Sequence, residues 1–148
     1  DKVVAETLWI DEKDHLARGI TRDGILYGFS DRDNLVARDL MTGEKIASVD
    51  LGRGQREPHH LTAIAGRYLV ALDHDGTCDV VDLGEDGRTL KVVAVDNRLG
   101  LRGYKKYDFF NEGAQPALSG NRLFIRSYTD VYCIGDPSEP TRLSDEHK

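Results

Sequence analysis

Two short acidic turns are the parts of this sequence best suited to binding a metal ion. Residues 31–34 read Asp-Arg-Asp-Asn, and residues 73–76 read Asp-His-Asp-Gly. Alternating carboxylate oxygens can bind Ca²⁺ when further ligands converge, but neither turn is followed by the later glutamate of an EF-hand loop. Aspartate, asparagine and glycine also favour tight hairpin turns. We therefore expect hairpin turns at both places and predict no metal site.

The histidines and serines give no stronger indication of chemistry. His59, His60 and His74 are candidate metal ligands. A zinc site needs three or four converging ligands, and adjacent residues on a strand point to opposite faces. We expect surface or core histidines. No catalytic nucleophile is predicted at any of the four serines that lie in predicted strands or turns without a strained nucleophile motif, namely Ser30, Ser48, Ser119 and Ser127.

The elements that carry these residues recur along the chain. Gly24, Gly66 and Gly120 each precede an apolar strand, and they lie 42 and 54 residues apart. A period of roughly 40 to 50 residues with several short strands per unit is typical of a β-propeller blade. No stretch has a sustained helical period. The sequence therefore predicts an all-β fold, a partial β-propeller of about three four-stranded antiparallel blades with the last one incomplete.

The predicted blades cover about 15–52, 59–97 and 114–136, with an inserted loop at 98–113 and a tail at 137–148. Predicted strands span 17–21, 25–30, 34–40 and 45–51, then 60–65, 68–73, 78–83 and 89–95, then 115–119, 122–127 and 131–134. Residues 7–10 read as a strand of a preceding blade. Because propellers close with about four to eight blades, we expect a segment of a larger propeller.

Three further expectations concern burial and the edges of the sheets. Residues 92–95 are apolar on both faces, which predicts a strand covered on both sides. Cys78 and Cys133 occupy equivalent third-strand positions, too far apart for a disulfide, and we expect two buried free thiols. The tail begins with prolines that cannot continue a ladder, so the third blade has three strands and leaves an exposed edge.

The charged residues disfavour nucleic-acid binding. The chain has 26 acidic and 20 basic residues, a formal net charge of −6, and no basic cluster. Neutralising phosphates requires clustered Lys and Arg. Apolar runs such as 68–72 are far shorter than the roughly 20 residues that cross a bilayer. We predict no nucleic-acid partner and no membrane span.

Residues 37–46 resemble the repeat of the pyrroloquinoline-quinone-like (PQQ-like) β-propellers. The blades of that family carry an alanine, an aspartate two residues later and a Thr-Gly turn, matched here by Ala37, Asp39, Thr42 and Gly43. The tryptophan that ends the family's repeat is replaced by Ala47. The resemblance implies that these are structural turn residues.

The later units resemble the same repeat less closely. Asp82 and Gly87 match the aspartate and glycine of the turn, with one inserted residue, whereas 133–135 lack the aspartate. Residues 121–135 resemble the carboxy-terminal blade of bacterial PQQ-like repeat proteins. Some members of the superfamily are quinoprotein dehydrogenases that hold a quinone and Ca²⁺ at the ring centre, and others are non-catalytic scaffolds in the bacterial envelope.

The inserted loop at 98–113 is the strongest candidate for a binding surface. Long loops in compact domains are commonly functional or disordered. Tyrosine and phenylalanine anchor protein interfaces, with charged residues at the rim; the alternative is that the phenylalanines cover the core of the blade. The candidate binding residues are Tyr104, Lys105, Lys106, Tyr107, Phe109 and Phe110.

Taken together, these patterns favour a non-catalytic propeller scaffold or protein-binding module, in the periplasm or outside the cell, with no cofactor. Its partners are the remaining blades of the same propeller or another protein chain. One alternative is a fragment of a quinoprotein dehydrogenase or other propeller enzyme, with PQQ and Ca²⁺, whose active site lies mostly outside this chain. A third interpretation, a propeller hydrolase or sugar-binding protein, requires polar and aromatic residues around the ring centre.

Overall fold

A computed structural model describes residues 5–12, 16–30, 34–52, 61–73, 76–98, 115–126 and 130–139. These residues form strands and turns without a helix, in sheets of four, four and three strands. Every strand pair is antiparallel. The prediction of an all-β chain whose third sheet is one strand short is confirmed.

Each sheet follows chain order, and we call the sheets blades 1, 2 and 3. Blade 1 contains β1 (Ala17–Arg22), β2 (Ile25–Phe29), β3 (Asn34–Asp39) and β4 (Lys45–Asp50). Blade 2 contains β5 (Leu61–Ala65), β6 (Tyr68–Leu72), β7 (Thr77–Asp82) and β8 (Lys91–Arg98). Blade 3 contains β9 (Ala117–Ser119), β10 (Arg122–Arg126) and β11 (Val131–Ile134).

The hairpins form where the sequence supplies residues that tolerate left-handed backbone. In the first hairpin of each blade, two residues separate paired strands, and the glycine there has a φ of 76° at Gly24, 58° at Gly66 and 56° at Gly120. Two-residue hairpin turns need this backbone, which glycine adopts without strain. The glycine is the second turn residue in blade 1, after Asp23 with a φ of 49°, and the first in blades 2 and 3, so each blade has a two-residue hairpin that depends on a glycine.

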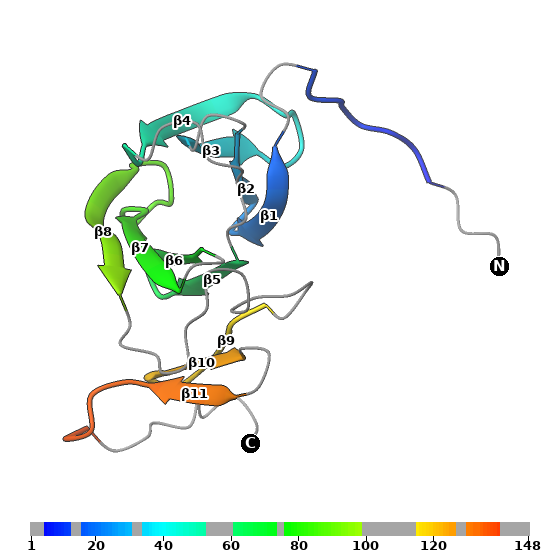
Figure 1. Ribbon diagram of the computed structural model, residues 1–148. Coiled ribbons are helices and arrows are strands. Elements are labelled where there is room, and N and C mark those ends of the chain that lie inside the picture. Colours follow the sequence, from blue (N-terminus) through cyan, green and yellow to red (C-terminus); the bar gives the residue numbers. More distant parts are fainter. Residues whose placement is uncertain are drawn as a thin grey trace, which may run out of the picture.

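The three blades follow one another in space as they do in the chain, with blade 2 between the other two (Figure 1). The first strands bring the sheets together, since β1 contacts β5 and β5 contacts β9. The three sheets are thus joined through their first strands, as neighbouring propeller blades are joined around an axis.

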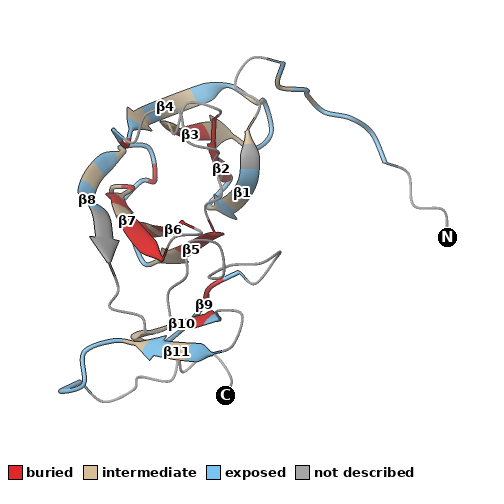
Figure 2. Cartoon of the chain, in the orientation of Figure 1, coloured by how far each residue is buried: buried red, intermediate tan, exposed pale blue. Residues whose placement is uncertain are grey.

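The buried residues lie on the facing sides of neighbouring blades. Between blades 1 and 2 the core includes Tyr27, Phe29, Leu35, Leu69 and Val81, each no more than 1% exposed. A smaller cluster of Leu61, Leu72, Cys78 and Ile125 joins blades 2 and 3. Figure 2 shows that burial is concentrated in the middle strands of blades 1 and 2.

Two burial predictions are wrong. Val93 and Val95 are 55% and 42% exposed, because they alternate with Val92, which packs against the core between blades 1 and 2, and therefore lie on the other face of β8. Cys133 is exposed while Cys78 is buried, and both are free. Cys133 lies on β11, the edge strand of the incomplete blade, where no further strand among the described residues covers it.

Residues 7–10 form no ladder with any described strand. They are part of an extended N-terminal segment, residues 5–12, which lies outside the three sheets (Figure 1) and contacts blade 1 through Trp9 and Asp11.

Candidate functional site

An aspartate holds the turn after the third strand of each blade. Asp39 Oδ1 accepts hydrogen bonds from the backbone N–H groups of Met41 and Thr42, both at 2.9 Å. Asp82 Oδ1 accepts from Gly84 N at 2.9 Å. These bonds satisfy turn amides that have no ladder partner, which is the structural role of an aspartate in such turns.

Blade 3 also has such an aspartate, although the sequence comparison found none at 133–135. Asp136 Oδ1 accepts from Ser138 N at 2.8 Å and from Ser138 Oγ at 2.6 Å. The aspartate lies two residues beyond β11 instead of at the end of the strand, so alignment to the repeat misses it. The Asp-x-Ser spacing is the signal that would have identified it.

The hydrogen bonds within these turns lower the pKa of the turn aspartate in both blade 1 and blade 3. The amides of Thr42 and then Met41 lower the pKa of Asp39 below its usual value. The hydroxyl and amide of Ser138 lower the pKa of Asp136. Hydrogen bonds to a carboxylate favour its charged form, so both groups are set as hydrogen-bond acceptors within their turns.

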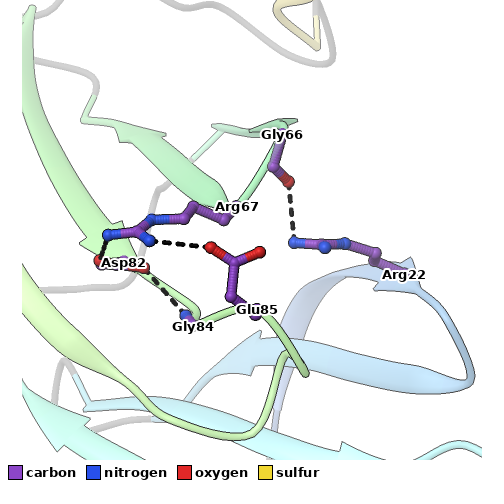
Figure 3. A network of polar contacts seen from close by, with 6 residues as sticks. All are labelled: Arg22, Gly66, Arg67, Asp82, Gly84 and Glu85. Atoms are coloured by element: carbon purple, nitrogen blue, oxygen red, sulfur yellow. Dashed lines mark hydrogen bonds and ion pairs between the residues drawn. The ribbon is translucent and has the colours of Figure 1, made fainter.

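In blades 2 and 3 an arginine ties this turn to the blade's first hairpin, and Figure 3 shows the contacts in blade 2. Arg67 binds Asp82 Oδ2 at 2.7 Å and Glu85 Oε1 at 3.0 Å. Its hydrogen bond to Glu85 is the main cause that raises the pKa of Arg67. In blade 3, Arg122 Nη2 donates to Glu139 O at 2.7 Å. Each arginine thus closes its own blade's turn.

Arg22, in contrast, bonds from one blade to the next. Its Nη1 donates to Gly66 O at 2.8 Å, which joins the first hairpin of blade 1 to that of blade 2. Its Nε pairs with Asp23, which is 78% exposed on its side chain. The hairpin ends of blades 1 and 2 therefore form one charged, partly exposed ridge made of Arg22, Asp23, Arg67, Asp82 and Glu85.

Two aromatic side chains dock on glycines of the later turns. Tyr27 donates its hydroxyl to Gly87 O at 2.7 Å in a buried contact between blades 1 and 2. Trp9 Nε1 donates to Leu40 O at 2.9 Å, and a side chain at Gly43 would lie 2.6 Å from its ring carbon Cδ2. Both glycines have a φ of 73°. Each is a place where an aromatic ring requires the absence of a side chain.

Ala47, at the position of the family's blade tryptophan, packs half-buried against the core between blades 1 and 2. Trp9 and Tyr27 instead make the aromatic contacts to turns. Neither was identified from the sequence, because each partner lies at least 31 residues away along the chain.

An open hollow of 380 Å³ lies where the three first strands meet. Gln115 Oε1 accepts the Thr62 amide across blades 2 and 3 at 3.2 Å, and these two residues give the lining its polar side chains. The described lining residues are Gly19, Ile20, Thr62, Ala63, Ile64, Gln115, Pro116 and Leu118.

The described lining of this hollow is mostly apolar. It includes no carboxylate and no aromatic ring among the described residues.

Several candidate residues fall outside the described part of the chain. They include the loop residues Tyr104, Lys105, Lys106, Tyr107, Phe109 and Phe110, the three histidines, Ser127, and Asp31, Asp33 and Asp75. Asp73 is described and is 3% exposed. Its carbonyl accepts from Gly76 N at 3.0 Å, as expected for a turn. Across the described ranges no three His, Cys, Asp or Glu side chains are grouped to hold a metal.

The serines that are described differ in exposure. Ser30 is buried at 7% exposure and donates its amide to Asn34 O at 3.0 Å, within the turn after β2. Ser48 and Ser119 are exposed on strands. The structure places each of them in a strand or turn, as the sequence predicted.

Comparison with known proteins identifies a fold. A crystal structure of BamB from Moraxella catarrhalis superposes with a TM-score of 0.54 at 16% sequence identity, over 84% of this chain. The chain has a β-propeller fold. The match spans only 34% of the BamB chain, about a third of its length. No family model matches the sequence, and no curated protein does.

The described residues contain no helix long and apolar enough to span a membrane.

Proposed function

We propose that this chain is part of a non-catalytic PQQ-like propeller scaffold that binds protein, located in the periplasm of a bacterium or outside the cell. The proposal rests on one observation: the polar and aromatic side chains at the blade turns bond to the turns themselves or to the neighbouring blade. Asp39, Asp82, Arg67 and Tyr27 all hold a turn or a blade junction. The repeat residues therefore stabilise the fold, and we propose that partners bind to the surfaces between them.

The BamB likeness supports the propeller part of the proposal, because it covers most of this chain. The partners are the remaining blades of the same propeller or a second protein chain. The loop at 98–113 joins β8 to β9 and carries the aromatic anchors proposed to contact such a partner. A few hot-spot residues, enriched in Trp, Tyr and Arg, carry most of the binding energy at protein interfaces.

The proposal is tested by replacing Tyr104, Tyr107, Phe109 and Phe110 together with alanine. Partners are first identified by cross-linking in the envelope fraction, and each purified partner is then titrated against the variant. We expect at least about a tenfold weaker Kd, since losing interface anchors costs more than about 1.4 kcal/mol. Circular dichroism should show the fold unchanged.

A matched control replaces two exposed apolar residues elsewhere, Met41 and Val93, which are 68% and 55% exposed. It should bind as the wild type does. Lys105→Glu with Lys106→Glu tests the rim and should slow association. Unchanged affinity in the alanine variant would overturn the role of the loop. A quinone chromophore or Ca²⁺-dependent dye reduction by the protein would replace the scaffold proposal with the dehydrogenase alternative.

A further inference from the structure

We propose that the hairpin ends of blades 1 and 2 bind an acidic peptide segment of a partner protein, with Arg22 and Arg67 as the receptors for two of its side-chain carboxylates. This inference rests on the proposed scaffold function, because it assigns a partner of stated chemistry to such a scaffold. It goes further by naming a surface that is separate in sequence from the loop at 98–113, and the residues that form it.

Arg67 is the first receptor, and its two ion pairs differ in exposure. Its Nη2 lies 2.7 Å from Asp82 Oδ2, and the Asp82 side chain is 15% exposed. Its Nη1 lies 3.0 Å from Glu85 Oε1, and the Glu85 side chain is 86% exposed. Asp82 also accepts the Gly84 amide within the turn. Asp82 therefore anchors the guanidinium, whereas Glu85 is an outer ligand in contact with solvent.

Arg22 repeats this arrangement from the neighbouring blade. Its Nη1 donates to Gly66 O at 2.8 Å, which anchors the side chain at the first hairpin of blade 2. Its Nε lies 3.0 Å from Asp23 Oδ2, and the Asp23 side chain is 78% exposed. Because Gly66 directly precedes Arg67, both arginines are held at the same hairpin (Figure 3). Each arginine thus has one inner anchor and one exposed carboxylate.

The exposed carboxylates can be exchanged at little cost. Ion pairs between exposed side chains contribute little to stability, because both charges remain hydrated and salt screens them. A carboxylate from a partner can therefore replace Glu85 or Asp23 while the inner anchors keep each guanidinium in place. A side chain that is already held in place loses less conformational entropy on binding. The planar fork of a guanidinium also matches the two oxygens of a carboxylate.

Tyr68 adds an aromatic surface beside Arg67. Tyr68 is 39% exposed, and the Arg67 guanidinium lies 5.3 Å from the centre of its ring, within the range of a cation–π contact. Tyrosine and arginine are among the residue types enriched at the hot spots of protein interfaces. The segment that fits this surface has two acidic side chains and an apolar or aromatic residue next to them.

The attraction to such a segment is local. The chain has a formal net charge of −6, so its overall field does not draw an acidic partner from a distance. The two guanidiniums must therefore supply the attraction themselves, and binding should depend on each of them.

The matching arginine of blade 3 is used differently. Arg122 donates to the backbone carbonyls of Asp136 and Glu139. Among the described residues, no carboxylate forms an ion pair with it. Arg122 thus has no exposed carboxylate that a partner could replace, which makes it the matched control for the two receptors.

The test is a selection of random peptides displayed on phage. The library is selected on the purified chain and counter-selected on the double variant Arg22→Gln with Arg67→Gln. We expect the enriched peptides to carry two or more Asp or Glu residues. A synthetic copy of one enriched peptide is then titrated against each variant by fluorescence anisotropy, and circular dichroism checks that each variant is folded.

Three single variants separate recognition from folding. Arg67→Lys keeps the charge but removes the planar fork, and it should weaken the Kd of the selected peptide about tenfold or more. Glu85→Gln removes the competing carboxylate and should tighten the Kd about two- to fivefold. A role of Arg67 in folding alone predicts no such tightening. Arg122→Gln should bind the peptide as the wild type does.

A selection that yields no peptide able to distinguish the wild type from the double variant would overturn the inference, and so would enriched peptides without acidic residues. Unchanged or weaker binding by Glu85→Gln would also overturn it, because Glu85 would then not compete with the peptide.

Failure here is distinguishable from failure of the proposed function. A partner that is lost on alanine replacement in the 98–113 loop, with no peptide selected at the arginines, would refute this inference alone. A quinone chromophore in a protein whose selected peptides depend on Arg67 would refute the non-catalytic scaffold alone.

Discussion

The junction between blades 1 and 2 is built differently from the junction between blades 2 and 3. At the first, large side chains such as Tyr27, Phe29 and Leu69 are fully buried. At the second, Ile125 is the one fully buried hydrophobic side chain that the described part of blade 3 contributes, and its neighbours Leu123 and Tyr132 are half-buried.

The hydrogen bonds across the two junctions also differ, since the shortest bond at the first junction is buried and the bond at the second is longer and only partly buried. Tyr27 Oη and Arg22 Nη1 both donate to carbonyls of blade 2, the first of them in a buried setting. From blade 2 to blade 3, the Thr62 amide donates to Gln115 Oε1 at the longer distance of 3.2 Å, in a partly buried setting. Among the described residues, the core between blades 2 and 3 contains fewer fully buried apolar side chains than the core between blades 1 and 2.

The difference follows from the number of strands. Blades 1 and 2 have four strands each, whereas the described part of blade 3 has three, so that no described strand pairs with the outer edge of β11. Regions with few buried apolar contacts open at lower free energy than the core. Among the described strands, the unpaired edge of β11 therefore belongs to the blade with the fewest fully buried apolar side chains.

The largest expected effect comes from breaking the first junction. Tyr27→Ala removes a buried ring and should lower the free energy of unfolding by about 3 to 5 kcal/mol. Tyr132→Ala, at the second junction, removes a half-buried ring and should cost clearly less. Urea denaturation of both variants measures the difference. Equal losses would contradict the contrast between the junctions.

Ile125→Ala should act on blade 3 alone. Deleting most of this buried side chain should cost about 2 to 5 kcal/mol of local stability. We expect faster amide hydrogen exchange in β10 and β11, with exchange in β2 and β3 unchanged. Leu69→Ala, in the larger core, is the matched control and should speed exchange in both blades 1 and 2. Uniform acceleration by Ile125→Ala would show that the three blades unfold as one unit.

Tyr27→Phe tests the buried hydroxyl at the first junction. It leaves Gly87 O without its donor and should cost about 1 to 3 kcal/mol. Burial raises the pKa of Tyr27 above its usual value. The stability linked to this group is therefore fully present below the unfolded pKa of about 10 and is lost as pH rises toward the folded pKa.

Thermal unfolding of wild type and Tyr27→Phe from neutral to alkaline pH measures this linkage. The variant should lose less stability in the alkaline range than the wild type does. Tyr68→Phe, at a residue 39% exposed, is the control for removing a tyrosine hydroxyl outside the core. Parallel alkaline curves for wild type and Tyr27→Phe would show that the hydroxyl does not titrate with unfolding.

The smallest effect should come from the turns, where blades 1 and 3 are alike. The pKa values of Asp39 and Asp136 are both lowered by hydrogen bonds within their turns. The stability that each adds is present above the unfolded pKa of about 3.9 and is lost as pH falls toward the folded value. Asp39→Asn and Asp136→Asn should each flatten the acid side of the stability curve slightly, by similar amounts, as measured by thermal unfolding in acid.

Exposed Asp23→Asn is the control for these acid measurements. A much larger effect at Asp39 than at Asp136 would mean that the turns differ as the junctions do, and that the weak attachment of blade 3 extends to its turns.

The loop residues Tyr104, Lys105, Lys106, Tyr107, Phe109 and Phe110 remain a prediction from composition and loop length. Nothing in the described geometry bears on them. Local sequence identifies an aromatic cluster, but whether its rings face a partner or their own blade depends on packing that no local rule specifies.

The sequence by itself determined the strands and hairpins, because a glycine at a two-residue turn and an aspartate beside a turn act on residues a few positions away. Only the tertiary structure decided which groups meet across blades. Tyr27 reaches Gly87, Arg22 reaches Gly66, and Cys133 is exposed although Cys78 is buried. Those outcomes depend on how many strands each sheet has and on what covers it, which is a property of neighbouring sheets and not of neighbouring residues.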